Sequence, residues 1–97
     1  METKQYKKAY LTLLGNCSKS DWGGFQSEKI STIDDVKCLF SHNEGVIGLE
    51  ILCENIYEYN VIISIETYKL VEEIAIYLNS YGSNVEYKYI ESLVVAK

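Results

Sequence analysis

The 97-residue chain contains no proline and no arginine, and it has only one histidine and one tryptophan. No apolar run approaches the roughly 18 residues that a membrane helix needs, so we expect no membrane span. The net charge of −5 disfavours a partner that is held through its phosphate groups. Because 47% of the residues are hydrophobic and 12% are aromatic, the composition predicts one globular domain over residues 1–97 and excludes a disordered chain.

The scarcity of cysteine and histidine excludes several kinds of site. Cys17, Cys38 and Cys53 are an odd number without Cys-x-x-Cys spacing, which predicts neither a disulfide framework nor a zinc site. His42 alone cannot build a metal cluster, so we expect no metal and no cofactor. The apolar stretch 9–14, which follows three lysines, is shorter than the about 7–15 residues of a secretion signal. We therefore expect a reduced, cytoplasmic protein.

Two segments in the middle of the chain, residues 46–53 and 57–66, alternate in a way that is typical of half-buried strands. A three-residue connection, residues 54–56, keeps the two apolar faces on the same side, because a slip of one residue would turn every side chain over. The pattern predicts a β-hairpin with Glu54 in its loop. Its outward face carries Glu50, Leu52, Glu58, Asn60, Ile62 and Glu66.

Two helices are predicted on either side of this hairpin. Thr32 followed by Asp35 approximates a capping box, which indicates a helix over residues 33–41. An apolar stripe over residues 70–81, followed by Gly82, indicates the second helix.

Three further segments suit strands. Residues 8–14 favour a strand, residues 25–30 a short edge strand, and residues 84–95 a final strand. A helix remains the alternative at the N-terminus, since Tyr6, Ala9, Tyr10 and Leu13 also have helical spacing.

The elements in order read β-α-β-β-α-β, with or without the extra edge strand. This is the order of the ferredoxin-like split βαβ unit, in which both helices cover one face of an antiparallel sheet. We therefore predict an α+β fold whose other sheet face is exposed to solvent. The alternative is a more open sheet of five or six strands with an N-terminal helix in place of the first strand.

The sequence does not indicate a catalytic site. A cysteine nucleophile needs a base, and Cys38 lies four residues before His42, the one candidate. A structural thiol and a solvent-exposed histidine are the favoured interpretation. The acid pairs Asp34-Asp35 and Glu72-Glu73 suit the first turns of helices. We predict no catalytic residues, and a pocket joining Cys38 to His42 would instead indicate a small enzyme or a ligand-binding module.

The outward face of the predicted hairpin is acidic. Between Lys37 and Lys69 there are five glutamates and no lysine. Solubility alone explains any single exposed glutamate, whereas the cluster suits a basic protein partner equally well. The same acidity argues against direct binding of nucleic acid, although nine tyrosines could stack bases. Leu52 would add apolar contact, and Trp22 either anchors a second contact or, as we favour, lies in the core.

With these features the chain resembles the small acidic immunity proteins of bacterial toxin–immunity systems, including those of contact-dependent growth inhibition. The resemblance is one of class, carried by a single acidic domain without catalytic residues, by the loop at residues 20–25 and by the strand pair at residues 49–66. It implies a cytoplasmic inhibitor that binds a toxin domain, often a nuclease, and blocks its active site or an adjacent exosite.

The basic partner expected from the charge is therefore a protein toxin, and we expect the chain itself to be a monomer or a weak dimer. The alternative interaction role is an acidic inhibitor of a host nuclease, encoded by a phage or a mobile element. Such an inhibitor would spread its acids over several faces at phosphate-like intervals, whereas an immunity protein would gather them around apolar anchors.

Overall fold

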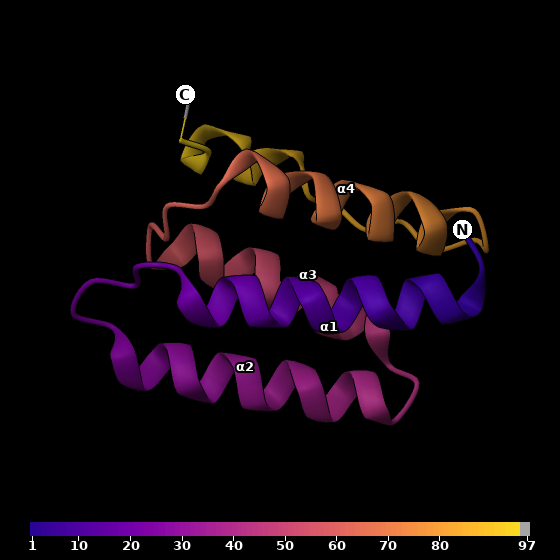
Figure 1. Ribbon diagram of the computed structural model, residues 1–97, viewed down its shortest axis with the longest axis horizontal. Helices are drawn as coiled ribbons and strands as arrows, with labels where there is room; N and C mark the ends of the chain where they lie inside the picture. Colours follow the sequence, from indigo (N-terminus) through magenta and orange to yellow (C-terminus); the bar gives the residue numbers. More distant parts are fainter. Residues whose placement is uncertain (96–97) are drawn as a thin grey trace.

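The computed structural model describes residues 1–95, and every element in that range is a helix. The elements are α1 (Thr3–Lys19), α2 (Gln26–Ser41), α3 (Gly45–Glu58), α4 (Ile65–Asn79) and the 3₁₀ helix η1 (Lys88–Leu93). In Figure 1, α1 lies in front of α3, with α2 below and α4 and η1 above. Because residues 1–95 form no sheet, the predicted α+β, ferredoxin-like fold is wrong.

The first predicted strand of the hairpin forms α3 because its apolar residues follow a helical period. The buried residues of α3 are Gly45, Gly48, Leu49, Leu52, Cys53 and Ile56. Steps of three and four residues place one side of a helix in the core. Residues 46–53 also matched an alternating pattern because all of them except Gly48 and Glu50 are apolar, and such a run fits both periods.

The second predicted strand is divided between α3, a short link and α4. Asn60, just beyond the end of α3, has a left-handed backbone with φ of 51°. The link that follows makes two isolated bridges, one from Ile62 to Asp21 and one from Ile63 to Val94. These bridges tie the link to the segment before α2 and to the segment after η1, and they do not form a sheet.

The two helices predicted from the sequence are confirmed, and both are longer than predicted. The helix predicted over residues 70–81 is α4, which begins at Ile65 because Ser64 caps it and accepts a hydrogen bond from the Thr67 N–H at 3.1 Å. The helix predicted over residues 33–41 is the second half of α2. The edge strand predicted over residues 25–30 is therefore wrong.

The two terminal strands are also wrong. Residues 8–14 belong to α1, which follows the helical spacing noted as the alternative and buries Tyr10, Leu13, Leu14 and Cys17. Residues 84–95 contain η1, and they bury Val85, Tyr87 and Ile90 against the core.

Trp22 joins the loop after α1 to the core. Its side chain is 1% exposed, and its indole Nε1 donates a hydrogen bond to the carbonyl oxygen of Cys17 at 2.8 Å. The bond therefore closes the C-terminal end of α1, where helix carbonyls lack partners within the helix. This burial explains why the loop between α1 and α2 has a defined path despite Gly23 and Gly24.

Candidate protein-binding surface

The exposed side of α3 carries every charge of that helix, and all of them are negative. Glu50, Glu54 and Glu58 are four residues apart, so they follow one side of the helix. Ile47, which is 47% exposed, and Tyr57 lie on the same solvent-facing part of α3. The helix thus presents carboxylates and apolar side chains together.

A groove connects this side of α3 to the C-terminal segment. Its cavity volume is about 400 Å³. It is lined by Ile47, Glu50, Ile51, Glu54, Glu86 and Tyr89. Half of these residues carry carboxylates and the other half are aliphatic or aromatic, so the groove suits a ligand that is both cationic and apolar.

The groove changes the acidity of Tyr89. Its pKa is raised to about 12, first by burial and then by coulombic interaction with Cys53, Glu54, Glu50 and Glu86. The phenol therefore stays neutral, and remains a hydrogen-bond donor, at more alkaline pH than an ordinary tyrosine.

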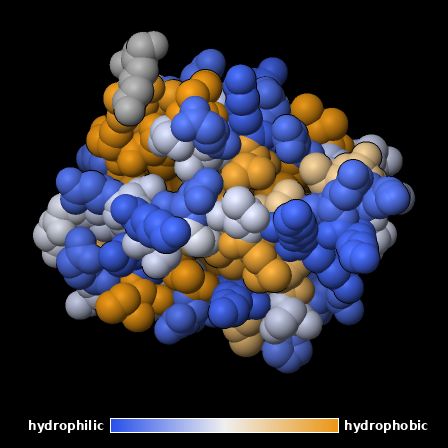
Figure 2. All heavy atoms as spheres, viewed as in Figure 1, coloured by the Kyte–Doolittle hydropathy of each residue, from blue (hydrophilic) through white to orange (hydrophobic). Residues whose placement is uncertain are grey.

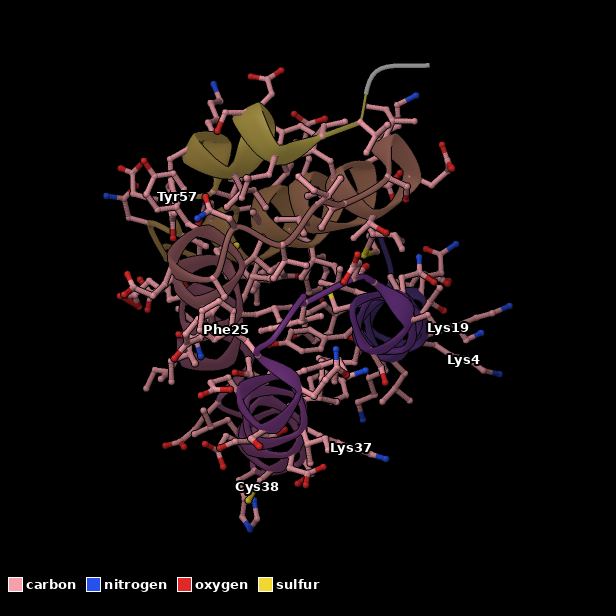
Figure 3. All side chains as sticks on the ribbon, turned by 90° about the vertical axis from the view of Figure 1, so that its left-hand side faces the viewer. Lys4, Lys19, Phe25, Lys37, Cys38 and Tyr57 are labelled. Atoms are coloured by element: carbon pink, nitrogen blue, oxygen red, sulfur yellow. The ribbon has the colours of Figure 1, made fainter. Side chains whose placement is uncertain are left out.

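Two tyrosine rings adjoin one another at this side of the molecule. The rings of Tyr57 and Tyr89 have centroids 5.3 Å apart and an interplanar angle of 81°, which is an edge-to-face contact. Figure 3 shows Tyr57 at the left of the molecule, on the side opposite to Lys4 and Lys19. Aromatic faces beside carboxylates attract ammonium and guanidinium groups.

The structure separates the other predicted contact residues from this groove. Leu52 and Trp22 are buried in the core, so neither is available to a partner. Asn60 is exposed in the turn after α3, and Glu66 lies in the first turn of α4. Glu66 and Lys19 line a different depression, so this glutamate is not part of one acidic face with Glu50.

Four residues of the groove were not predicted. Ile47 and Ile51 are not on the outward face of the predicted hairpin, whereas a helical period centred on Glu54 places them on the exposed side. Glu86 and Tyr89 lie more than thirty positions along the chain from Glu54, and no local pattern links them to α3.

Cys38 and His42 come together at the exposed C-terminal end of α2. The Cys38 Sγ lies 3.8 Å from the His42 Nδ1, but that nitrogen is also 2.8 Å from the Cys38 carbonyl oxygen. A carbonyl oxygen only accepts, so Nδ1 must be the donor and cannot take the proton of the thiol. The contact belongs to the C-terminal cap of α2, and neither side chain lines the groove.

Residues 1–95 contain neither a metal cluster nor a membrane-spanning helix. No group of three or more histidine, cysteine or acidic side chains in that range could hold a metal ion. None of the helices in the same range has the length and apolar character needed to cross a membrane.

Comparison of the chain with known protein families, with curated proteins and with solved structures found no match.

Proposed function

We propose that the chain is a cytoplasmic immunity protein that binds a basic toxin domain and blocks its active site or an adjacent exosite. The observation that carries the proposal is the groove between α3 and the C-terminal segment. Its lining combines the carboxylates of Glu50, Glu54 and Glu86 with the apolar side chains of Ile47 and Ile51. The proposal assigns binding, and no catalytic step, to this chain.

The groove fits the long cationic side chains of a basic protein. The aliphatic stem of a lysine or arginine would pack on Ile47 and Ile51, while its charged end would meet the carboxylates. An arginine would also stack on the ring of Tyr89. Opposed charges raise association rates from about 10⁵–10⁶ toward 10⁸–10⁹ M⁻¹s⁻¹ at low salt, which suits rapid neutralisation of a toxin.

The distribution of charge favours this proposal over mimicry of a nucleic acid. A mimic needs acids at phosphate-like intervals over several faces. Here Lys4, Lys19 and Lys37 project from the side of α1 and α2 that lies opposite Tyr57 (Figure 3). A nuclease that tracks along phosphates would meet repulsion on that side.

Coexpression tests the proposal. The chain is expressed with the toxin domain encoded beside its gene, and cell survival and copurification are measured. We expect the chain to restore growth and to copurify with the toxin in equal amount. Continued toxicity, together with failure of the two purified proteins to associate, would contradict the proposal.

Charge reversal then tests the groove. The variant Glu50→Lys/Glu54→Lys is compared with Glu66→Lys/Glu73→Lys, which makes the same change of charge elsewhere. We expect the first variant to slow association by about tenfold or more and the second to change it much less. Far-UV circular dichroism checks that both variants fold, and equal effects of the two variants would remove the groove from the interface.

A further inference from the structure

The helix α1 has the opposite charge to α3. It contains Lys4, Lys7, Lys8 and Lys19 and no acidic residue, and all four lysines are exposed. The toxin proposed above would contact the acidic groove, so it leaves this basic helix without a role.

An exposed apolar residue follows two of these lysines along one side of α1. Leu11 is 50% exposed, and it is seven residues after Lys4 and three after Lys8, so all three share one side of the helix. Figure 2, which views the molecule from the α1 side, shows hydrophilic atoms interrupted by apolar ones. A large exposed leucine among lysines is a surface on which a partner can pack.

The pattern on α1 complements the pattern in the groove. On α1, two lysines share a side of the helix with one exposed leucine, and the groove combines three carboxylates with the apolar pair Ile47 and Ile51. Each set extends over a seven-residue step, from Lys4 to Leu11 and from Ile47 to Glu54, which is about 10 Å along a helix.

We propose that the exposed side of α1 is a second docking surface, and that its occupant is the acidic groove of another copy of this chain. Leu11 packs on Ile47 and Ile51 in the groove, and Lys4 and Lys8 pair with Glu50 and Glu54. The proposal does not depend on the toxin.

The placement of the two surfaces sets the geometry of the assembly. Figure 1 is viewed along the shortest axis of the molecule, and α1 lies in front of α3 along that axis. The Cα extent in that direction is 20 Å. Figure 3 shows Lys4 of α1 and Tyr57, whose ring contacts Tyr89 of the groove, on opposite sides of the molecule. Each contact is therefore head-to-tail, and the copies add as an open stack instead of a closed pair.

Salt controls this association. The net charge of −5 repels a second copy, but the oppositely charged side chains of the contact lie closer together than the other charges of the two molecules, so their attraction is the larger effect. The screening length falls from about 30 Å at 0.01 M salt to about 8 Å at 0.15 M. Self-association is therefore expected at low ionic strength. A toxin with more positive charge than the second copy displaces that copy from the groove.

Sedimentation velocity of the purified chain tests the proposal. In about 20 mM salt we expect the weight-average sedimentation coefficient to rise with protein concentration, and in about 500 mM salt to stay at the monomer value. A monomer at all concentrations in low salt overturns the proposal. So does a plateau at the mass of a dimer, because a closed pair is not a head-to-tail contact.

Charge-swap variants identify the two surfaces. Lys4→Glu/Lys8→Glu makes both surfaces acidic, and Glu50→Lys/Glu54→Lys makes both basic, so each variant alone should be monomeric. An equimolar mixture should associate again, because each variant supplies a partner for the other. The control Lys29→Glu/Lys69→Glu has the same net charge as Lys4→Glu/Lys8→Glu. It should still self-associate more than that variant does. Failure of the mixture to associate overturns the proposal.

The outcome is separable from that of the toxin experiment. The variant Lys4→Glu/Lys8→Glu keeps the groove intact, so it should lose self-association and retain toxin binding. Loss of toxin binding in this variant would show that α1 takes the toxin instead of a second copy. Toxin binding by a wild-type chain that never self-associates would overturn this inference alone.

Discussion

The hydroxyl group of Tyr10 donates a hydrogen bond to the carbonyl oxygen of Gly45 at 2.8 Å, and it thereby joins α1 to the first residue of α3. The same ring stacks on Phe40 of α2, with centroids 4.2 Å apart. One side chain thus connects three helices. The contact requires a glycine at position 48, because a Cβ there would lie 2.6 Å from the Tyr10 hydroxyl oxygen.

This relationship predicts energetic coupling between Tyr10 and Gly48. Gly48→Ala should destabilise the protein by about 1–3 kcal/mol because it overpacks the core, and Tyr10→Phe by about 0.5–1.5 kcal/mol because it removes the hydrogen bond. Since Tyr10→Phe also removes the obstructing oxygen, the double variant should be more stable than the sum of the two losses by about 0.5 kcal/mol or more. Urea unfolding measures all three, and strict additivity would contradict the close contact.

Replacement of Trp22 tests its role at the end of α1. Trp22→Phe should lower the free energy of unfolding by about 1–3 kcal/mol, because it removes the bond to the Cys17 carbonyl and leaves space in the core. The matched control is Phe25→Leu, at a ring that is 44% exposed, and it should cost less than about 1 kcal/mol. Unfolding is followed by circular dichroism because Trp22 is the only tryptophan. Equal costs would argue against the burial of Trp22.

Two isoleucines on α4 give a direct test of the helix. Ile74 is fully buried and Ile76 is 59% exposed, although a strand would place both on one face. Ile74→Asp buries a charge and should leave the chain unfolded or severely destabilised, whereas Ile76→Asp should change stability by about 0.5 kcal/mol or less. Thermal unfolding compares the two, and similar losses would be inconsistent with α4.

The three thiols should differ in reactivity. Cys38 is exposed, and Cys17 and Cys53 are buried. A thiol reagent at pH 8 should label Cys38 in the folded chain and all three cysteines in denaturant. The variant Cys38→Ser should lose the fast reaction. Fast labelling of Cys17 or Cys53 under native conditions would contradict their burial.

Stability should fall at alkaline pH. Burial raises the pKa of Cys17 and of Cys53 from 9.0 to about 12, so the fold favours the neutral thiols. Their contribution is complete below about pH 9 and is lost as the pH rises toward 12. Urea unfolding at several pH values should show this decline, and Cys17→Ala should make it shallower. A free energy of unfolding that stays constant above pH 9 would contradict this contribution of the two thiols.

The helices α2 and α4 could be predicted because each has a polar side that leaves a clear stripe of apolar residues. The helix α3 could not, because residues 46–53 are apolar except for Gly48 and Glu50, and such a segment fits a strand and a helix equally well. The length of the buried pattern distinguishes the two. The buried positions extend from Gly45 to Ile56, and a strand rarely covers that distance.

The residues of the candidate site were also predicted only in part. Glu50 was placed on the outward face of a hairpin and Glu54 in its loop, and they line one groove because steps of four residues share a side of a helix. Leu52 was placed beside them by the alternating pattern, and the helical period moves it into the core.

Composition and order along the chain are enough to show that α1 is basic and that the later part is acidic, because charge is a property of each residue. They are also enough to show that cysteine and histidine are too sparse for a zinc cluster. Helix packing was needed to bring Glu86 and Tyr89 to α3, and to turn the lysines of α1 to the opposite side of the molecule. These relations depend on contacts between distant segments, and local sequence patterns carry no information about such contacts.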